Sequence, residues 1–405
     1  MNPYKHLFII RYSEIGLKGK NREWFEQKLM RNIRQHLSSE EASKVTKIHG
    51  RIIVETNADS DKVTSRLQYI PGIANFSLAL ETTHELGPIN EIVLQLVSEY
   101  IGKVKREDIT FKIAACRSDK HFSKNSVQLA AELGGTVLER YPTFKVDLTQ
   151  PECVIGIEIW PKDRAILYLE KTPGVDGLPV GTSGKVLSFL SGGIDSPLAS
   201  YSMMTRGSKT VYINFHSYPF IGEQSREKVI DLVKHLSRFQ TESILLIVPF
   251  TEIQKAIKQE CQERYRTLLY RRLMYHIGNR ISKNHKISAY VTGEAVGQVA
   301  SQTIENLTCT EEAANKLILR PLIGMAKSEI INKAKQIGTY PISIQPFPDC
   351  CTVFQPRKPE THARLHLVLK EENKLDVETL VNEAVEKTEK LTFETQIIDT
   401  ALINF

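Results

Sequence analysis

The sequence predicts a multidomain protein in which two small α+β units precede a doubly wound α/β domain. Three observations support this fold class. The chain has 405 residues, which is more than one hydrophobic core usually supports. Short strands and helices alternate before residue 170, and after it apolar, β-branched strands alternate with helices. A stretch rich in glycine and proline, residues 173–184, lies between the two halves and is expected to be a linker.

The first unit is predicted to span residues 1–80. It opens with an apolar strand at residues 7–12, and a helix is expected from Asn21, a suitable N-cap, to Leu37 because apolar side chains recur every four residues. The remaining expected elements are a strand, a helix and a strand, at residues 52–54, 63–69 and 74–80. This order is typical of a small ferredoxin-like α+β unit.

The second α+β unit is predicted to span residues 81–172. Its expected helices lie at residues 90–101 and 127–141. Its expected strands lie at residues 109–115, 144–146, 154–159 and 165–169.

The third domain is predicted to span residues 185–405. Its expected strands lie at residues 186–190, 211–215, 243–248 and 287–291, and its expected helices at residues 227–235 and 253–283. Such alternation indicates a parallel, doubly wound sheet, in which ligands bind at the carboxyl ends of the strands where the strand order switches. A charged helical tail is expected at residues 370–390.

Composition limits the class of protein. The chain is 41% hydrophobic and 25% charged, which is ordinary for a soluble protein, and neither a membrane span nor a secretory leader is evident. A cytoplasmic location and no membrane association are therefore expected. The six cysteines are scattered apart from the adjacent Cys350 and Cys351, so neither a disulfide framework nor a Cys-x-x-Cys zinc site is indicated.

Positive charge is concentrated in two places. The first fifty residues hold ten Lys/Arg against five Asp/Glu, and residues 103–124 hold seven against three. Such patches suit a polyanionic partner recognised at particular places. The alternative is that they are ordinary solvated helix faces.

The most informative motif is Ser-Gly-Gly-Ile-Asp-Ser-Pro at residues 191–197, between an apolar strand and a helix. Glycines allow close backbone approach to an oxyanion, and the N-terminus of the helix favours negative charge. Ser191 and Ser196 add hydroxyl donors, and Asp195 could hold a divalent cation. The motif lacks the Gly-Lys-Ser/Thr of the Walker loop. It resembles the PP-loop of enzymes that split ATP between the α and β phosphates, although an ordinary Gly-rich turn is the alternative.

Other candidate residues follow the predicted strands. Asn214 and Phe215 end one strand, and Gly293, beyond another, would permit close approach to a nucleotide. Arg271, in a helix, could bind a phosphate or be a surface residue. Cys350 and Cys351 are the only clustered thiols. They could be unreactive structural residues, or a thiolate here could deliver sulfur to an activated carbon with loss of AMP.

Five motifs together carry a family resemblance. They are residues 11–22, the 191–197 loop, residues 293–302, Arg-Pro-Leu-Ile at 320–323 and Asp-Cys-Cys at 349–351. In this order they resemble the tRNA 4-thiouridine synthetase (tRNA sulfurtransferase) family over nearly the whole chain. The resemblance implies a ferredoxin-like domain, a THUMP RNA-binding domain and a PP-loop domain of the adenine nucleotide alpha hydrolase type. RNA recognition through phosphates and 2′-hydroxyls fits such a basic α+β module.

The resemblance also implies roles for individual residues. ATP would be bound by Phe189, Leu190, Ser191, Gly192, Gly193, Asp195, Ser196, Asn214, Phe215, Arg271, Gly293 and Gln302. The catalytic residues would be Asp195, which also holds Mg²⁺, together with Lys327, Cys350 and Cys351. RNA would be bound by Lys18, Lys20, Arg22, Lys112, Arg117, Lys120 and Lys124.

Two departures from the family pattern are notable. The family's usual Met-Asp-Lys reads Met325-Ala326-Lys327 here, so the carboxylate next to Lys327 is missing. Some members end in a rhodanese domain whose cysteine carries the persulfide, and this chain is expected to lack one. Sulfur would then come from a separate donor, a cysteine desulfurase or another persulfide source, with Cys351 as the best-aligned thiol.

The implied reaction has two halves. O4 of uridine 8 in tRNA attacks the α-phosphorus of ATP, and persulfide sulfur then replaces AMP at C4 to give 4-thiouridine. The resemblance also implies a homodimer and a second role in sulfur transfer to a carrier protein for thiamine synthesis. Three alternatives stay open: a PP-loop amidotransferase or ligase for a small molecule, a 2-thiouridine or iron–sulfur-dependent thiolase, and an RNA-binding protein with a vestigial ATP site.

Overall fold

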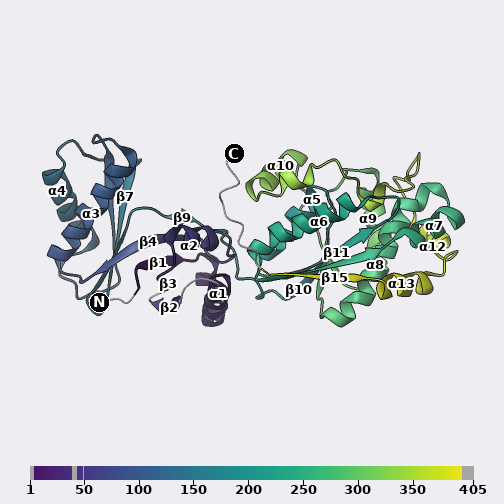
Figure 1. Ribbon diagram of the computed structural model, residues 1–405, viewed down its shortest axis with the longest axis horizontal. Helices are drawn as coiled ribbons and strands as arrows, with labels where there is room; N and C mark the ends of the chain where they lie inside the picture. Colours follow the sequence, from purple (N-terminus) through teal and green to yellow (C-terminus); the bar gives the residue numbers. More distant parts are fainter. Residues whose placement is uncertain (1–3, 39–42, 49, 395–405) are drawn as a thin grey trace. The chain divides into compact units, whose positions relative to one another are not determined.

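The computed structural model describes residues 4–38, 43–48 and 50–394, apart from the side chain of Cys351. It divides into two compact units, residues 1–177 and 178–405 (Figure 1). Each unit has its own sheet and its own hydrophobic clusters. The ferredoxin-like, THUMP and PP-loop order predicted from the sequence agrees with the succession of elements along the chain.

The first unit is built on one continuous sheet. The strands follow the order β2-β3-β1-β4-β8-β7-β5-β6, and β9 also pairs with β4. The bounds of the strands are β1 His6–Arg11, β2 Lys44–Ile48, β3 Arg51–Thr56, β4 Asn75–Thr82, β5 Thr110–Arg117, β6 Lys145–Val146, β7 Cys153–Trp160, β8 Arg164–Tyr168 and β9 Thr172–Pro173. The helices are α1 Arg22–His36, α2 Ser60–Leu67, α3 Leu86–Val104 and α4 Ser126–Arg140.

Strand β4 joins the two halves of this sheet. Its Asn75–Ala79 part pairs with β1, and its Leu80–Thr82 part pairs with β8. A buried ion pair between Arg11 and Glu158 (3.2 Å) also links the halves. The limits predicted for the first two domains, at residues 80 and 81, therefore fall within a strand that both halves share, and they stay predictions.

The prediction for the first unit missed strand β2, which pairs with β3 in an antiparallel hairpin. Lys44, Thr46 and Lys47 leave the strand with little apolar character, and only Val45 is buried. Asn21 occupies the N-cap of α1, but its side chain makes no capping hydrogen bond.

The second unit contains a six-stranded sheet in the order β14-β13-β10-β11-β12-β15. The strands are β10 Lys185–Phe189, β11 Lys209–His216, β12 Glu242–Pro249, β13 Ala289–Val291, β14 Leu317–Leu319 and β15 Glu389–Glu394. All neighbours are parallel except β12 and β15. Since β10 lies between β11 and β13, the strand order switches beside it, which is where a doubly wound sheet opens a crevice.

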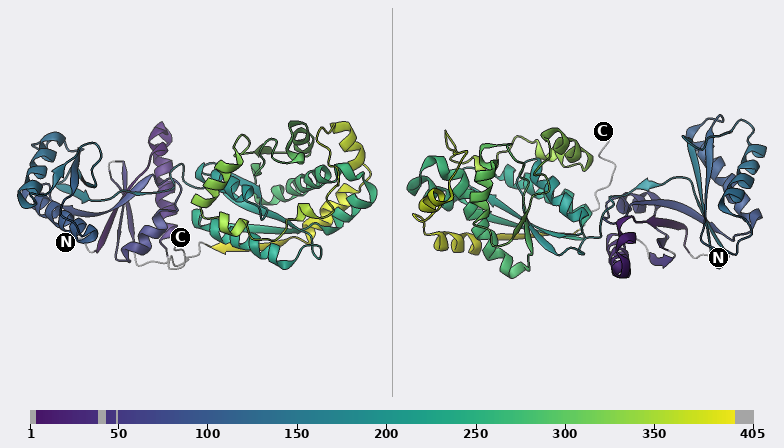
Figure 2. Two further views of the ribbon diagram at one scale, coloured as in Figure 1. Left: turned by 90° about the horizontal axis from the view of Figure 1, so that it is seen from above. Right: turned by 180° about the vertical axis from the view of Figure 1, so that it is seen from behind.

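Helices cover both faces of this sheet, as the views in Figures 1 and 2 show. On one face lie α5 Asp195–Thr205, α6 Glu223–Leu236 and α10 Lys327–Gln336. On the other lie α7 Thr251–Glu260, α8 Arg266–His285 and α13 Val377–Glu386. The remaining helices are α9 Ile304–Glu311, α11 Tyr340–Ser343 and α12 Leu365–Glu372.

Two expectations for this unit are wrong. The single helix predicted over residues 253–283 is two helices, because the chain leaves the helix at Cys261 and turns before α8 begins. Apolar periodicity continues through the break and so hides it. The tail is helical as expected in α12 and α13, but it ends in the antiparallel strand β15.

Candidate functional site

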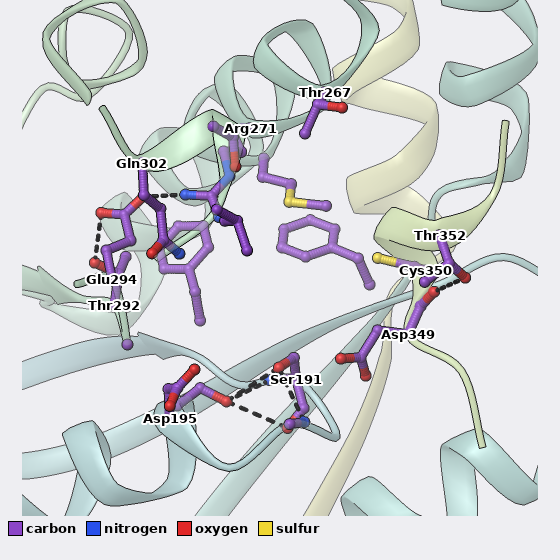
Figure 3. A pocket seen from close by; sticks show the side chains of 18 of the residues that line it. Ser191, Asp195, Thr267, Arg271, Thr292, Glu294, Gln302, Asp349, Cys350 and Thr352 are labelled. Atoms are coloured by element: carbon purple, nitrogen blue, oxygen red, sulfur yellow. Dashed lines mark hydrogen bonds and ion pairs between the residues drawn. The ribbon is translucent and has the colours of Figure 1, made fainter. Parts of the chain in front are cut away.

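The loop after β10 shapes a cradle of donors in front of helix α5. The backbone N–H of Ser191 donates to Oγ of Ser196 (2.9 Å), and the N–H of Gly193 donates to Oγ of Ser191 (3.2 Å). The two hydroxyl oxygens lie 3.2 Å apart. The loop is therefore held by its own serines at the positive end of α5 (Figure 3).

A carboxylate lies against this cradle. The N–H of Gly192 donates to Oδ1 of Asp349 at 2.8 Å, although the two residues are far apart in sequence. Burial raises the pKa of the Asp349 carboxyl group, and the Gly192 hydrogen bond and the charge of Lys228 offset part of that rise.

Asp195, the first residue of α5, has both carboxylate oxygens engaged. Lys327 Nζ lies 2.5 Å from Oδ1, and Gln298 Nε2 donates to Oδ2 at 2.8 Å. The Asp195 carboxylate thus holds Lys327 although the carboxylate usual beside that lysine is replaced by Ala326. The structure brings Asp195 and Lys327 together, as the assignment of both to one site requires.

The loop forms one wall of a cavity of about 490 Å³ at the carboxyl ends of β10, β11 and β13. The predicted nucleotide residues line it, with the exception of Gly192: Phe189, Leu190, Ser191, Gly193, Asp195, Ser196, Asn214, Phe215, Arg271, Gly293 and Gln302. Cys350 lines the same cavity. Residues from distant parts of the chain therefore converge as the doubly wound topology predicts.

Aromatic rings form the apolar part of the cavity. Phe189 stacks with Phe215 at 6.0 Å between centroids and lies 5.2 Å from the ring of Tyr275. Asn214 donates its side-chain amide to the carbonyl of Leu190 at 2.9 Å, which ties the ends of two neighbouring strands together. Flat apolar surfaces beside an anion cradle suit a ligand with a planar base and phosphates.

Arg271 projects from α8 toward the cavity but pairs with the buried Glu294. Glu294 also accepts from Arg320 Nε at 2.7 Å and from the Thr292 hydroxyl at 2.9 Å. Burial alone would raise the pKa of Glu294, but the charges of Arg271 and Arg320 outweigh it and keep the pKa below its usual value. Arg271 is therefore an oriented cation at the cavity wall rather than a surface residue.

Gly293 lines the cavity, and the structure shows a further reason for glycine at this position. A Cβ on this residue would lie 2.6 Å from the backbone nitrogen of Ser196, so the tight contact is with the first turn of α5. A side chain here would push the helix N-terminus away from the sheet.

The cysteines fall into two groups. Burial raises the pKa of Cys153 to about 12 and that of Cys261 to about 11, so both thiols stay protonated at neutral pH. Cys350 lies in the short turn η6, Cys350–Thr352, where its carbonyl accepts from Gln254 Nε2 at 2.9 Å. The backbone of Cys351 belongs to the same turn, and its side chain lies outside the described part of the chain.

The residues predicted to bind RNA all lie in the first unit. Arg117 donates to the carbonyls of Phe122 (2.9 Å) and Lys124 (3.1 Å), and so it shapes the loop that carries Lys120 and Lys124. Three others have partners: Lys124 pairs with Glu132 at 2.7 Å, Lys112 donates to the Leu148 carbonyl at 3.1 Å, and Arg22 pairs with Glu26 at 2.8 Å. Lys20 and Lys120 are exposed, and Lys18 lies 5.2 Å from the centre of the Phe25 ring.

Several residues that line the cavity, or that contact a lining residue as Arg320 contacts Glu294, were missed by the sequence prediction. Glu294, Arg320, Gln298 and Asp349 stand within motifs that carried the family resemblance. Their partners lie 26 to 157 residues away along the chain, so no local sequence pattern indicates these contacts. Tyr275 has the sequence pattern of an ordinary core residue of an amphipathic helix.

A cluster of three or more His, Cys, Asp or Glu side chains that could hold a metal ion is absent among the described residues. Within those residues, helices that combine the length and apolar character of a membrane span are also absent.

Comparison with known proteins covers the whole of this architecture. Family models match at residues 7–77 (ThiI ferredoxin-like domain), 85–170 (THUMP domain) and 181–377 (Thiamine biosynthesis protein, ThiI). A probable tRNA sulfurtransferase of Natranaerobius thermophilus is 41% identical over 96% of both chains. Another, of Alkaliphilus oremlandii, is 42% identical over 96% of this chain and 100% of its own.

Solved structures agree. A 4-thiouridine synthetase, crystallised as an RNA complex with bound ATP, is 36% identical with a TM-score of 0.88, over 96% of this chain and 100% of that one. The protein PH1313 of Pyrococcus horikoshii is 27% identical with a TM-score of 0.65, over 82% and 99% of the two chains. With its fold, its loop and identities of about 40% over nearly its full length, the chain belongs to the tRNA sulfurtransferase family and is an enzyme of the 4-thiouridine synthetase type.

Proposed function

We propose that the cavity binds ATP and uses it to adenylate uridine 8 of tRNA at O4. The base would lie against Phe189, Phe215 and Tyr275, and the phosphates against the loop and α5. O4 attacks the α-phosphorus, pyrophosphate leaves, and the uridine is left with a good leaving group at C4. The crystal structure of a related enzyme with RNA and ATP supports both ligands.

Mg²⁺ fits this site as a companion of ATP. Mg²⁺ is usually held by one or two carboxylates together with phosphate oxygens and water. Asp195 provides one carboxylate at the cavity, and Lys327 and Gln298, which now occupy its oxygens, could turn to the phosphates. When bound, the ion would neutralise phosphate charge. Lys327 would stabilise the charge of the departing pyrophosphate.

The second half of the reaction transfers sulfur. The terminal sulfur of a persulfide attacks C4, AMP leaves, and a second thiol then cleaves the sulfur–sulfur bond to release 4-thiouridine and a disulfide. We assign the persulfide exchange to Cys351, with Cys350 or an external thiol as the resolving partner. The position of Cys350 at the wall of the cavity supports this assignment, because it brings the turn with both cysteines to the activated base. A cysteine desulfurase or another persulfide source would load the sulfur.

The first unit is proposed to hold the tRNA. Lys18, Lys20, Arg22, Lys112, Arg117, Lys120 and Lys124 would contact phosphates or shape the loops that do. Uridine 8 must leave its stack to reach the cavity, so the enzyme needs a binding surface well beyond the catalytic site. A homodimer, a cytoplasmic location and a second role with a sulfur-carrier protein of thiamine synthesis are part of the same proposal.

One observation carries the proposal: the Ser-Gly-Gly-Ile-Asp-Ser loop, the aromatic wall and Cys350 line a single cavity. The test is mass spectrometry of nucleosides from tRNA incubated with enzyme, Mg-ATP and a persulfide source. We expect 4-thiouridine, with AMP and pyrophosphate released in proportion. Thionucleoside of the 2-thio type, or pyrophosphate released with a small molecule in place of tRNA, would favour the alternative enzymes. If the enzyme consumes no ATP, the alternative of an RNA-binding protein with a vestigial ATP site is favoured.

A further inference from the structure

The segment before the cysteine turn folds directly over the phosphate cradle. Asp349 Oδ1 accepts from the Gly192 N–H at 2.8 Å, and the Asp349 carboxylate also accepts from the Ser191 hydroxyl. A Cβ on Gly192 would lie only 2.9 Å from the same oxygen. The carboxylate thus lies against the face of the loop that glycine leaves open, which explains why Gly192, alone among the residues predicted to bind ATP, does not line the cavity.

The backbone around Asp349 is fastened from helices α6 and α7. Lys228 donates to the carbonyl of Gln345 at 2.9 Å, and Ser225 donates to the carbonyl of Pro348 at 2.8 Å. On the other side of Asp349, Gln254 holds the carbonyl of Cys350. The Asp349 side chain therefore reaches the loop from a stretch of backbone that is anchored on both sides.

We propose that Asp349 is a positioning residue that competes with the phosphates of ATP for the amide groups of the loop, and that its displacement by nucleotide moves the Cys350–Thr352 turn. The proposal rests on the proposed function of the cavity. A carboxylate and a phosphate oxygen need the same N–H donors and repel each other at this distance. Since Cys350 directly follows Asp349, a displacement that carries the backbone of Asp349 with its carboxylate would move the turn as well. Nucleotide occupancy would thereby be linked to presentation of the thiols.

The first test measures nucleotide affinity. Binding of α,β-methylene-ATP with Mg²⁺, and of inorganic pyrophosphate, is measured by calorimetry for the wild type, Asp349→Asn and a control, Asp231→Asn. Asp231 is an exposed residue of α6. Removing the competing charge should tighten binding of both ligands at least about tenfold in Asp349→Asn. The control should be unchanged. A residue that merely supported the loop would weaken binding when replaced, so the sign of the effect separates the two roles.

The second test follows the turn itself by hydrogen exchange of amides 345–354 in the full-length protein. In the wild type, α,β-methylene-ATP should speed exchange in this segment. In Asp349→Ala exchange should already be fast without nucleotide and should change little when it is added. Thermal unfolding confirms that each variant is folded.

The outcomes separate this proposal from the function it rests on. If the wild type binds the nucleotide and Asp349→Asn binds it equally or more weakly, the competition is disproved and the ATP site stands. If affinity rises but exchange in the wild type does not respond, the link to the cysteine turn is disproved. If the wild type binds neither ligand, the proposed function falls as well.

Discussion

Asp195 shows how one carboxylate can serve several parts of a reaction. It begins α5, it bonds both Lys327 and Gln298, and it lies in the wall of the cavity that the loop encloses. It pairs with Lys327 although Ala326, the residue before this lysine, has no polar side chain. Charge at this single position therefore holds Lys327, and it is the carboxylate that we propose for Mg²⁺.

We predict that Asp195→Ala abolishes tRNA-dependent release of pyrophosphate. The substitution removes the carboxylate for Mg²⁺ and releases Lys327, so transition-state stabilisation is lost while the RNA-binding residues of the first unit are untouched. A pyrophosphate assay and a tRNA-binding assay are run side by side, with Asp231→Asn as the control. Pyrophosphate release near the wild-type rate would disprove the assignment of the loop.

The roles of Cys350 and Cys351 in sulfur transfer can be distinguished by single substitutions. Cys351→Ser keeps the size of the side chain but removes the nucleophile, so the variant should still adenylate tRNA and yet yield no 4-thiouridine from a persulfide donor. Cys350→Ser should be milder unless Cys350 resolves the intermediate. Cys261→Ser is the control, because its thiol is buried with a raised pKa. Normal thionucleoside yield from Cys351→Ser would move the chemistry to Cys350 or to an external persulfide.

At the level of helices and strands, the sequence predicts most of the fold, because the side of an element that is buried determines the spacing of its apolar residues. The strands β10, β11 and β12 are buried along most of their length and carry several apolar residues each, and they were found within two residues of their ends. Strand β2 was missed because a polar hairpin edge carries no such pattern, and the break at Cys261 was missed because the apolar pattern runs through it. The loop was found because its chemistry is local in sequence, whereas Asp349 and Glu294 act through contacts that only the folded chain creates.

The loop between β5 and α4 allows a test of RNA binding. Lys112, Lys120 and Lys124 are the residues to neutralise, since Arg117 also holds the loop carbonyls and its loss would change the loop's shape. Replacing all three with glutamine should weaken tRNA binding and lower the slope of log K against log salt by about one per lost phosphate contact. ATP affinity should not change. The control is the triple replacement Lys283, Lys370 and Lys387 in the second unit; if both triples behave alike, the first patch is merely solvated charge.

Helix α12 is tied to α8 by a buried ion pair whose contribution depends on pH. Arg272, whose side chain is 2% exposed, lies 2.6 Å from Glu372, and His276 lies 3.3 Å from the same carboxylate. Burial alone would raise the pKa of Glu372, but hydrogen bonds from His276 and Arg272 and the charge of Arg272 lower it to about 2. A lowered pKa in the folded state stabilises the fold above the unfolded pKa of about 4.5, and that stability is lost as the pH falls toward 2.

Glu372→Gln should therefore destabilise the second unit by about 3 kcal/mol at pH 7, because Arg272 stays buried with only the half-exposed Glu312 as an acidic partner. The free energy of unfolding in urea is compared for wild type and variant at pH 7 and at pH 3. The difference between them should shrink at pH 3, since that pH lies between the unfolded and folded pKa values of Glu372 and part of the stabilising contribution is already lost there. Glu378→Gln, in α13, is the control. An equal difference at both pH values would show that the ion pair is not the source of the stability.

On the scale of the whole molecule, the hydrophobic clusters indicate which parts of the chain should unfold as one cooperative unit. The described residues of each unit form their own clusters of buried side chains. Within the first unit, however, one cluster joins Leu7, Ile9 and Ile53 to Trp160, Ile166 and Tyr168. The ferredoxin-like and THUMP parts therefore share a core as well as a sheet, and the Arg11–Glu158 pair is buried between them.

We expect thermal unfolding to show two transitions, one for each unit, instead of three. A ligand stabilises only the unit that binds it, by RT ln(1 + [L]/Kd), so Mg²⁺ with α,β-methylene-ATP at about 100 times its Kd should add about 2.7 kcal/mol to one transition alone. Calorimetry with and without the nucleotide assigns that transition to the second unit.

Glu372→Gln should lower the midpoint temperature of the second unit's transition and leave that of the first unit unchanged. Arg11→Met, which takes one of its two cationic partners from the buried Glu158 and leaves Arg51, should lower the midpoint of the first unit's transition. A separate third transition that responds to Arg11→Met would show that the two halves of the shared sheet unfold independently, in spite of the strand that joins them.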